Sequence, residues 1–113
     1  MTPAFVDTVA WVHLDNGRIL CARPRGKDIF YIPGGKREGT ETDLQTLLRE
    51  IAEELTVALL PDTVTHLGTY EAYQPHGHPG GAVVRMSCYA DRPQVPLVDQ
   101  LLFDDLNATG ELR

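Results

Sequence analysis

Apolar and polar residues alternate over residues 5–14, where β-branched side chains are also frequent, and this pattern predicts a β-strand. Asn16-Gly17 comes next. This dipeptide is the strongest short signal for a hairpin, because both residues tolerate positive φ. Residues 18–23 are therefore predicted to return as the partner strand.

Three more segments have the composition of strands. They cover residues 29–33, which Pro33-Gly34-Gly35 should end, and residues 64–73 and 82–90, which a loop joins. Strands that lie on both sides of a helical segment in the sequence predict an α/β (α+β) fold in a single domain, residues 1–113.

Two segments have the periodicity of helices. The first shows one apolar face through Leu44, Leu48, Ile51 and Leu55, at spacings of four, three and four. Thr40 is expected to cap it, with Asp43 three residues further on, so the helix should run from about residue 41 to 55. The second predicted helix covers about residues 97–107, and its apolar face consists of Val98, Leu101, Leu102 and Leu106.

Composition narrows the classes of function. The 113 residues carry a net charge of −6, which argues against a nucleic acid polymer as partner, since such binding usually needs a basic face. Cys21 and Cys88 lie in apolar stretches and are expected to be free thiols in a reducing compartment. No secretory signal and no membrane-spanning stretch is evident, so we expect a cytoplasmic protein that does not contact a membrane.

The predicted first helix carries an unfavourable concentration of negative charge. Glu50, Glu53 and Glu54 share one face, near the end where the helix dipole is negative. Like-charge repulsion and the dipole together oppose this arrangement by about 1–2 kcal/mol. A divalent cation would reverse that cost, since carboxylates suit Mg²⁺. A solvated acidic face with no ligand is the alternative.

The wider pattern favours the cation. Gly35, Glu41 and the run Arg49-Glu50-Ile51-Ala52-Glu53-Glu54-Leu55-Thr56-Val57 resemble the Nudix box, G-x5-E-x7-R-E-U-x-E-E-x-G-U, in which U is aliphatic. All identity positions of the box match except its last glycine. The resemblance implies an α/β/α sandwich with a mixed sheet, and hydrolysis of a diphosphate linkage in a nucleoside diphosphate derivative, with Mg²⁺ or Mn²⁺ as cofactor.

Residue by residue, the resemblance also implies a site. The expected metal ligands are Glu50, Glu53, Glu54 and the backbone carbonyl of Gly34. Either Glu50 or Glu53 would take a proton from the attacking water, and Glu50 is preferred; Arg49 would orient the glutamates and Glu41 would hold metal-bound waters. Arg23, Arg25 and Lys36 could bind substrate phosphates, although solubilising loop charges are an equal alternative.

The substrate class stays open at this point. A small nucleotide is expected, foremost a nucleoside triphosphate, oxidised ones included, cleaved to monophosphate and pyrophosphate. A dinucleoside polyphosphate, weakly favoured by the position of Tyr73, or a nucleotide sugar is an alternative within the same chemistry. A catalytically silent Nudix-fold module that binds nucleotide is the alternative outside it.

Two departures from the family pattern stand out. Thr56 replaces the last glycine of the box, which usually ends the helix in a left-handed conformation that a β-branched residue adopts at a cost. Compared with the family pattern, a strand and its loop are missing after Ala90, because the C-terminal apolar segment follows almost at once. A strand edge left uncovered there could support a homodimer.

Overall fold

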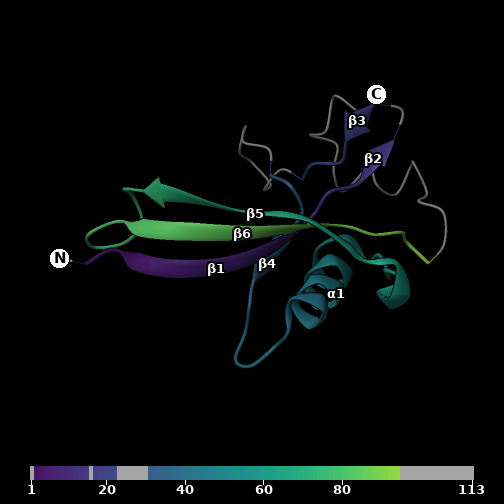
Figure 1. The fold of residues 1–113 in the computed structure, drawn as a ribbon, viewed down its shortest axis with the longest axis horizontal. Coiled ribbons are helices and arrows are strands. Elements are labelled where there is room, and N and C mark those ends of the chain that lie inside the picture. The colour runs from purple at the N-terminus through teal and green to yellow at the C-terminus, as the bar shows by residue number, and fades with distance from the viewer. Residues whose placement is uncertain (1, 16, 23–30, 95–113) are drawn as a thin grey trace.

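A four-stranded mixed sheet forms the centre of the protein (Figure 1). The computed structural model describes residues 2–15, 17–22 and 31–94. The strands of the sheet, in spatial order, are β4 (Gly34–Lys36), β1 (Ala4–Trp11), β6 (Ala82–Ala90) and β5 (Thr65–Gln74). Strand β1 pairs parallel with β6 and antiparallel with β4, and β5 pairs antiparallel with β6. The predicted mixed sheet and its last two strands are confirmed.

The hairpin predicted at Asn16-Gly17 is also confirmed, but it is shorter than expected. Strands β2 (Leu14–Asp15) and β3 (Arg18–Ile19) pair antiparallel, and Gly17 has a φ of 74°. The strand expected over residues 5–14 is therefore divided, because β1 ends at Trp11 and the chain leaves the main sheet. Beyond β3, an isolated bridge joins Ala22 to Tyr31.

Strand β4 corrects another prediction. Pro33-Gly34-Gly35 was expected to end a strand over residues 29–33, yet the two glycines themselves begin β4. Close packing explains the difference, since a Cβ on Gly34 would lie 2.0 Å from the carbonyl oxygen of Val9 in β1. Only a chain without side chains at this point can approach the central strand so closely.

Helix α1 (Asp43–Leu55) begins two residues later than predicted. Its N-cap is Thr42, whose hydroxyl accepts a hydrogen bond from the Gln45 amide at 3.1 Å, while the Gln45 side chain accepts one from the Thr42 amide at 2.9 Å. This reciprocal pair is a capping box, so the cap predicted at Thr40 is wrong. Asp43, its expected partner, bonds to other side chains instead.

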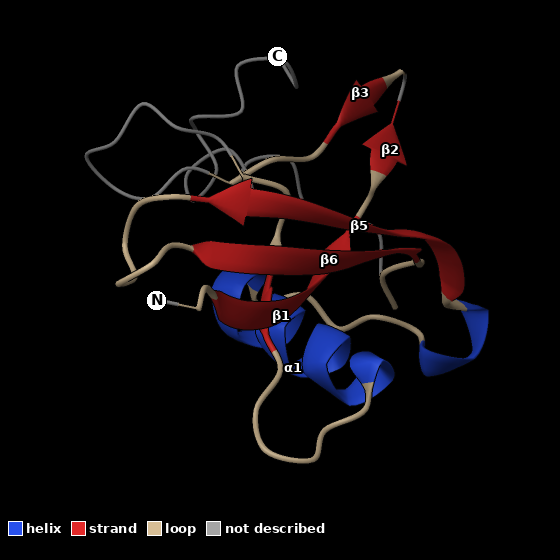
Figure 2. Cartoon of the chain, turned by 60° about the vertical axis from the view of Figure 1, so that its left-hand side comes forward, coloured by secondary structure: helices blue, strands red, loops and turns tan. Residues whose placement is uncertain are grey.

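Helix α1 lies against one face of the sheet (Figures 1 and 2), and the hydrophobic core fills the space between them. Leu47, Ile51 and Leu55 are buried there against Val9 and Trp11. The buried face of α1 thus differs slightly from the predicted one. Leu47 is buried, whereas Leu44 and Leu48, which were predicted to face the core, are only partly buried. The Trp11 indole donates a hydrogen bond to the carbonyl oxygen of Asp91 at 3.0 Å. Cys88 is buried and Cys21 is half-buried, and the two do not form a disulfide.

A short 3-10 helix, η1 (Pro61–Thr63), leads from α1 toward β5. After β6, the chain turns back along this segment: the Leu60 amide donates to the Arg92 carbonyl at 2.9 Å, and the Gln94 amide donates to the Ala58 carbonyl at 2.7 Å. Within the part of the chain described up to residue 94, β6 is the last strand. The helix expected over residues 97–107 lies outside the described residues. Helix α1 is too short and too polar to cross a membrane.

The end of α1 generates a first prediction. Thr56 caps the helix with φ 58° and ψ 37°, and no other described non-glycine residue has positive φ. Because a left-handed β-branched residue is strained, we expect Thr56→Gly to raise the free energy of unfolding by about 1 kcal/mol, measured by urea denaturation. Thr65→Gly, at the start of β5, is the control and should lower it by about 0.5–1 kcal/mol. An unchanged or lower stability of Thr56→Gly would contradict the strain.

Candidate active site

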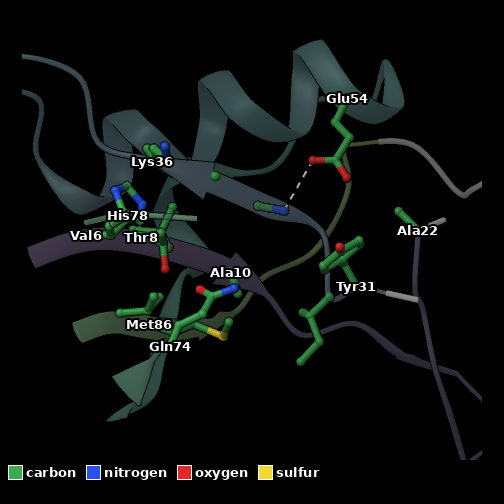
Figure 3. Close-up of a pocket in the computed structure, with 15 residues that line it drawn as sticks. Val6, Thr8, Ala10, Ala22, Tyr31, Lys36, Glu54, Gln74, His78 and Met86 are labelled. Carbon is green, nitrogen blue, oxygen red and sulfur yellow. Dashed lines mark hydrogen bonds between the residues drawn. The ribbon is translucent and has the colours of Figure 1, made fainter. Parts of the chain in front are cut away.

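Two glycines of β4 bring the backbone against the carboxylates of α1. A Cβ on Gly35 would lie 1.8 Å from Oε1 of Glu50, so the Glu50 carboxylate fills the space that a side chain would need. The amide of Gly34 donates to Oε2 of Glu54 at 3.4 Å, a long hydrogen bond that Figure 3 marks with a dashed line. The C-terminal half of α1 therefore presents two of its glutamates to β4.

Arg49 connects Glu41 and Glu53 to the backbone at the end of β4. Its guanidinium donates two hydrogen bonds to the Glu41 carboxylate, at 2.7 and 2.9 Å, and a third to the carbonyl of Lys36 at 3.0 Å. It also lies 3.3 Å from Oε2 of Glu53 and 3.6 Å from Oε2 of Glu50. The hydrogen bonds from Arg49 are the main reason why the pKa of Glu41 falls to about 2.

Glu50 and Glu54 are in the opposite electrostatic situation. Burial raises the pKa of Glu50; Arg49 opposes this shift and Glu53 adds to it. Burial also raises the pKa of Glu54, the Gly34 amide opposes the shift, and Glu50 adds to it. Two neighbouring carboxylates that are both disfavoured as anions form a place where a cation would be stabilised.

The fit to a metal ion can be tested on these residues. Across residues 2–15, 17–22 and 31–94, no three His, Cys, Asp or Glu side chains are gathered closely enough to hold a metal by themselves. Mg²⁺ does not need such a cage, because it commonly takes one or two carboxylates, several waters and the phosphates of a substrate. The carboxylate oxygens of Glu50 and Glu54, both held against β4, fit a cation of that kind.

A cleft of about 710 Å³ opens beside these carboxylates. It lies on the face of the sheet opposite α1. Val6 and Thr8 of β1, with their partners Val84 and Met86 of β6, line the cleft, whereas the alternating residues Val9 and Trp11 turn their side chains to the core. Figure 3 shows Glu54 and Tyr31 on one side of the cleft and His78 and Val6 on the other. The lining residues that carry polar side chains are Thr8, Tyr31, Lys36, Glu54, Gln74 and His78.

The structure thus brings together most residues of the predicted site. Gly34, Glu41, Arg49, Glu50, Glu53 and Glu54 lie around the contact between β4 and α1, and Lys36 lines the cleft. Glu53 points outward to Arg49, with 62% of its side chain exposed. Arg23 and Arg25 lie outside the described residues. The sequence interpretation did not single out Gln74, Tyr31 and Met86, because they come from separate segments of the chain that only the fold brings to one cleft.

Comparison with known proteins decides the family. The family model described as the NUDIX domain matches residues 4–108. The chain belongs to the Nudix domain family. A solved Nudix hydrolase from Nitrosomonas europaea superposes with a TM-score of 0.67 at 24% identity, over 87% of this chain and 64% of that one. A MutT Nudix hydrolase from Burkholderia pseudomallei gives 0.64 at 24% identity, over 80% and 73%. Both share the Nudix fold with this protein.

A curated relative is similar over a shorter stretch. The RNA pyrophosphohydrolase of Halorhodospira halophila is 46% identical over 54 residues, which make up 48% of this chain and 29% of that protein. The match therefore spans less than a third of the length of that relative.

The contact between Gly35 and Glu50 generates the second prediction. Gly35→Ala should displace the Glu50 carboxylate and weaken Mn²⁺ binding about tenfold, measured by electron paramagnetic resonance of free Mn²⁺. Gly39→Asn is the control: Gly39 has a φ of +54°, nothing lies within 4 Å of its Cβ position, and asparagine tolerates this conformation. Equal Mn²⁺ affinity in Gly35→Ala and the control would show that the Glu50 position does not matter for the cation.

Proposed function

We propose that this Nudix protein is a pyrophosphohydrolase that cleaves a diphosphate linkage in a nucleoside diphosphate derivative with the help of Mg²⁺ or Mn²⁺. The favoured substrate is a nucleoside triphosphate, including oxidised ones, which yields the monophosphate and pyrophosphate. One observation carries this proposal: the acidic residues of the Nudix box and Arg49 surround β4 at the edge of an open cleft.

The carboxylates of Glu50 and Glu54 would hold the cation. The Nudix pattern adds the carbonyl of Gly34 and Glu53, whose carboxylate would turn from its contact with Arg49 toward the ion. When bound, the ion would neutralise phosphate charge and lower the pKa of a bound water. The burial that raises the pKa of Glu50 suits a general base, because a carboxylate of higher pKa accepts a proton more readily. Glu50 therefore takes the proton of the attacking water at its carboxylate.

Arg49, Glu41 and Lys36 have separate roles in this proposal. Arg49 fixes Glu41 through two hydrogen bonds and aligns Glu53, so that the carboxylates do not need to reorganise during the reaction. Glu41, kept ionised by Arg49, holds water at the edge of the site. Lys36, on the wall of the cleft, would bind a phosphate of the substrate. Arg23 and Arg25, for which the sequence predicts the same role, lie outside the described residues.

The cleft on the sheet accepts the nucleoside. Its volume of about 710 Å³ lies in the range of small-molecule sites, roughly 300–1,000 Å³. Val6, Val84 and Met86 supply an apolar floor for a base, while Gln74 and His78 supply side chains that can hydrogen-bond to its edge. Glu54 lines the same cleft and thereby connects the base site to the metal site.

A second candidate substrate is the 5′-triphosphate end of an RNA, and the similarity to the RNA pyrophosphohydrolase supports it. A net charge of −6 disfavours contacts along an RNA backbone but leaves room for recognition of one terminal nucleotide. Dinucleoside polyphosphates and nucleotide sugars contain the same diphosphate linkage and remain competing substrates.

The third prediction tests the activity. Phosphate and pyrophosphate release is measured for nucleoside triphosphates, dinucleoside polyphosphates, a nucleotide sugar and a short 5′-triphosphorylated RNA, with Mg²⁺ and with EDTA. We expect metal-dependent turnover that Glu50→Gln lowers by roughly 10²–10⁴-fold, the usual contribution of a general base. The control is Glu71→Gln on β5, where Glu71 pairs with Arg85 at 3.2 Å, and it should retain full activity.

The outcomes separate the candidates. A higher kcat/KM for the RNA than for any free nucleotide would assign the RNA end as substrate. Full activity of Glu50→Gln would remove Glu50 from the role of base. Folded wild-type protein that is silent with every substrate would favour a nucleotide-binding module without catalysis.

The fourth prediction tests the cleft. Met86→Trp should fill part of the cleft and raise KM about tenfold while kcat changes little, because the lost interactions hold the base rather than the reacting phosphate. Tyr70, which pairs with Met86 in register, does not line the cleft and provides the control Tyr70→Trp. Steady-state kinetics that show equal KM for the two variants would place the base elsewhere.

A further inference from the structure

Arg37 lies at the centre of a polar cluster that the Nudix pattern does not define. Its guanidinium donates to Oδ2 of Asp7 in β1 at 3.2 Å and to the backbone carbonyl of Glu41 at 2.9 Å. It also pairs with Asp43, the first residue of α1, and the Tyr89 hydroxyl of β6 donates to the other oxygen of Asp43. We propose that Arg37 is a positioning residue, which fixes the loop of residues 37–42 and the start of α1 so that the carboxylates of the site are aligned.

The loop is held from two sides by two arginines. Arg49 binds the Glu41 side chain and the Lys36 carbonyl, whereas Arg37 binds the Glu41 carbonyl. The Arg37 amide also donates to the Asp7 carbonyl at 3.1 Å, which ties the beginning of the loop to β1. Since Glu41 is the point where both arginines meet, loss of Arg37 would free the backbone that Arg49 depends on.

The cluster carries two costs in stability. Arg37, Asp7 and Asp43 each expose only 27–28% of their side chains, so their charges are partly desolvated. In the part of the chain that the structure describes, the buried Oδ1 of Asp7 has no hydrogen-bond partner. An apolar cluster of similar size would avoid both costs, so the geometric constraint that the cluster imposes on the loop is its benefit.

The planar guanidinium is what allows one side chain to reach three elements. It bonds in fixed directions to β1, to the loop and to α1, which the single point of a lysine ammonium cannot do. Burial and the hydrogen bond to Asp43 raise the pKa of Tyr89 to about 12, so its hydroxyl remains a donor at any ordinary pH. Tyr89 thereby orients Asp43 for Arg37.

The proposal rests on the proposed function, and it generates the fifth prediction. Arg37→Met should lower kcat by about ten- to a hundredfold and raise the Mg²⁺ concentration for half-maximal rate, with little change in KM for the nucleotide, because misalignment acts on the chemical step. Arg37→Lys should recover only part of the loss. Tyr89→Phe, which removes a single hydroxyl, should lower kcat severalfold. Arg85→Met, which breaks the exposed pair with Glu71, is the control and should leave kcat unchanged.

Amide hydrogen exchange of the metal-free protein provides a readout that does not depend on turnover. Faster exchange of the Glu41 amide in Arg37→Met than in Arg85→Met supports the proposal even where the proposed substrates fail. A wild-type rate and Mg²⁺ dependence in Arg37→Met, with only a lower melting temperature, would overturn it. Exchange at Glu41 identical in both variants would overturn it as well.

Discussion

The close approach of β4 to both β1 and α1 determines where every other part of the site lies. Gly34 has no room for a side chain because of the Val9 carbonyl, and Gly35 has none because of the Glu50 carboxylate. Because these two adjacent residues have no side chains, β4 can contact the central strand β1 and helix α1 at the same point. Glu50 and Glu54 of α1, the Gly34 amide and the cleft are neighbours as a consequence of this contact.

Charge is distributed around that contact in two distinct ways. Glu41 is strongly bonded to Arg49, which keeps it ionised and immobile. Glu50 and Glu54 are desolvated and repel each other, which leaves them ready for a cation. The first arrangement resembles a structural ion pair and the second resembles a ligand site. Arg49 lies between them, because it bonds to Glu41 and is also 3.6 Å from Glu50.

The sequence predicted the elements whose signals are local. The Asn16-Gly17 hairpin, the strands over residues 64–73 and 82–90, and the helix with its acidic face depend on neighbours within a few residues, and the structure has them all. The helix start was misplaced because Thr40 and Thr42 offer competing caps, and only the Gln45 side chain distinguishes them. The β4 strand was missed because Pro-Gly-Gly normally ends strands, whereas here tertiary packing requires glycines. The cleft and the Arg37 cluster join residues far apart in the chain, which no local pattern reveals.

Unfavourable features accumulate where α1 ends. Glu53 and Glu54 lie at the negative end of the helix dipole, Glu50 is desolvated beneath β4, and Thr56 adopts a left-handed conformation. Each of these costs stability, and they fall within seven consecutive residues of a helix that is otherwise well capped and well packed. Such local conflicts are expected at functional sites, where ligand binding offsets them. The N-terminal half of α1 stabilises the helix through its capping box, and the C-terminal half carries the carboxylates of the Nudix box. The loop of residues 37–42, held by Arg37 and Arg49, connects β4 to the start of this helix and so constrains how the helix lies against the sheet.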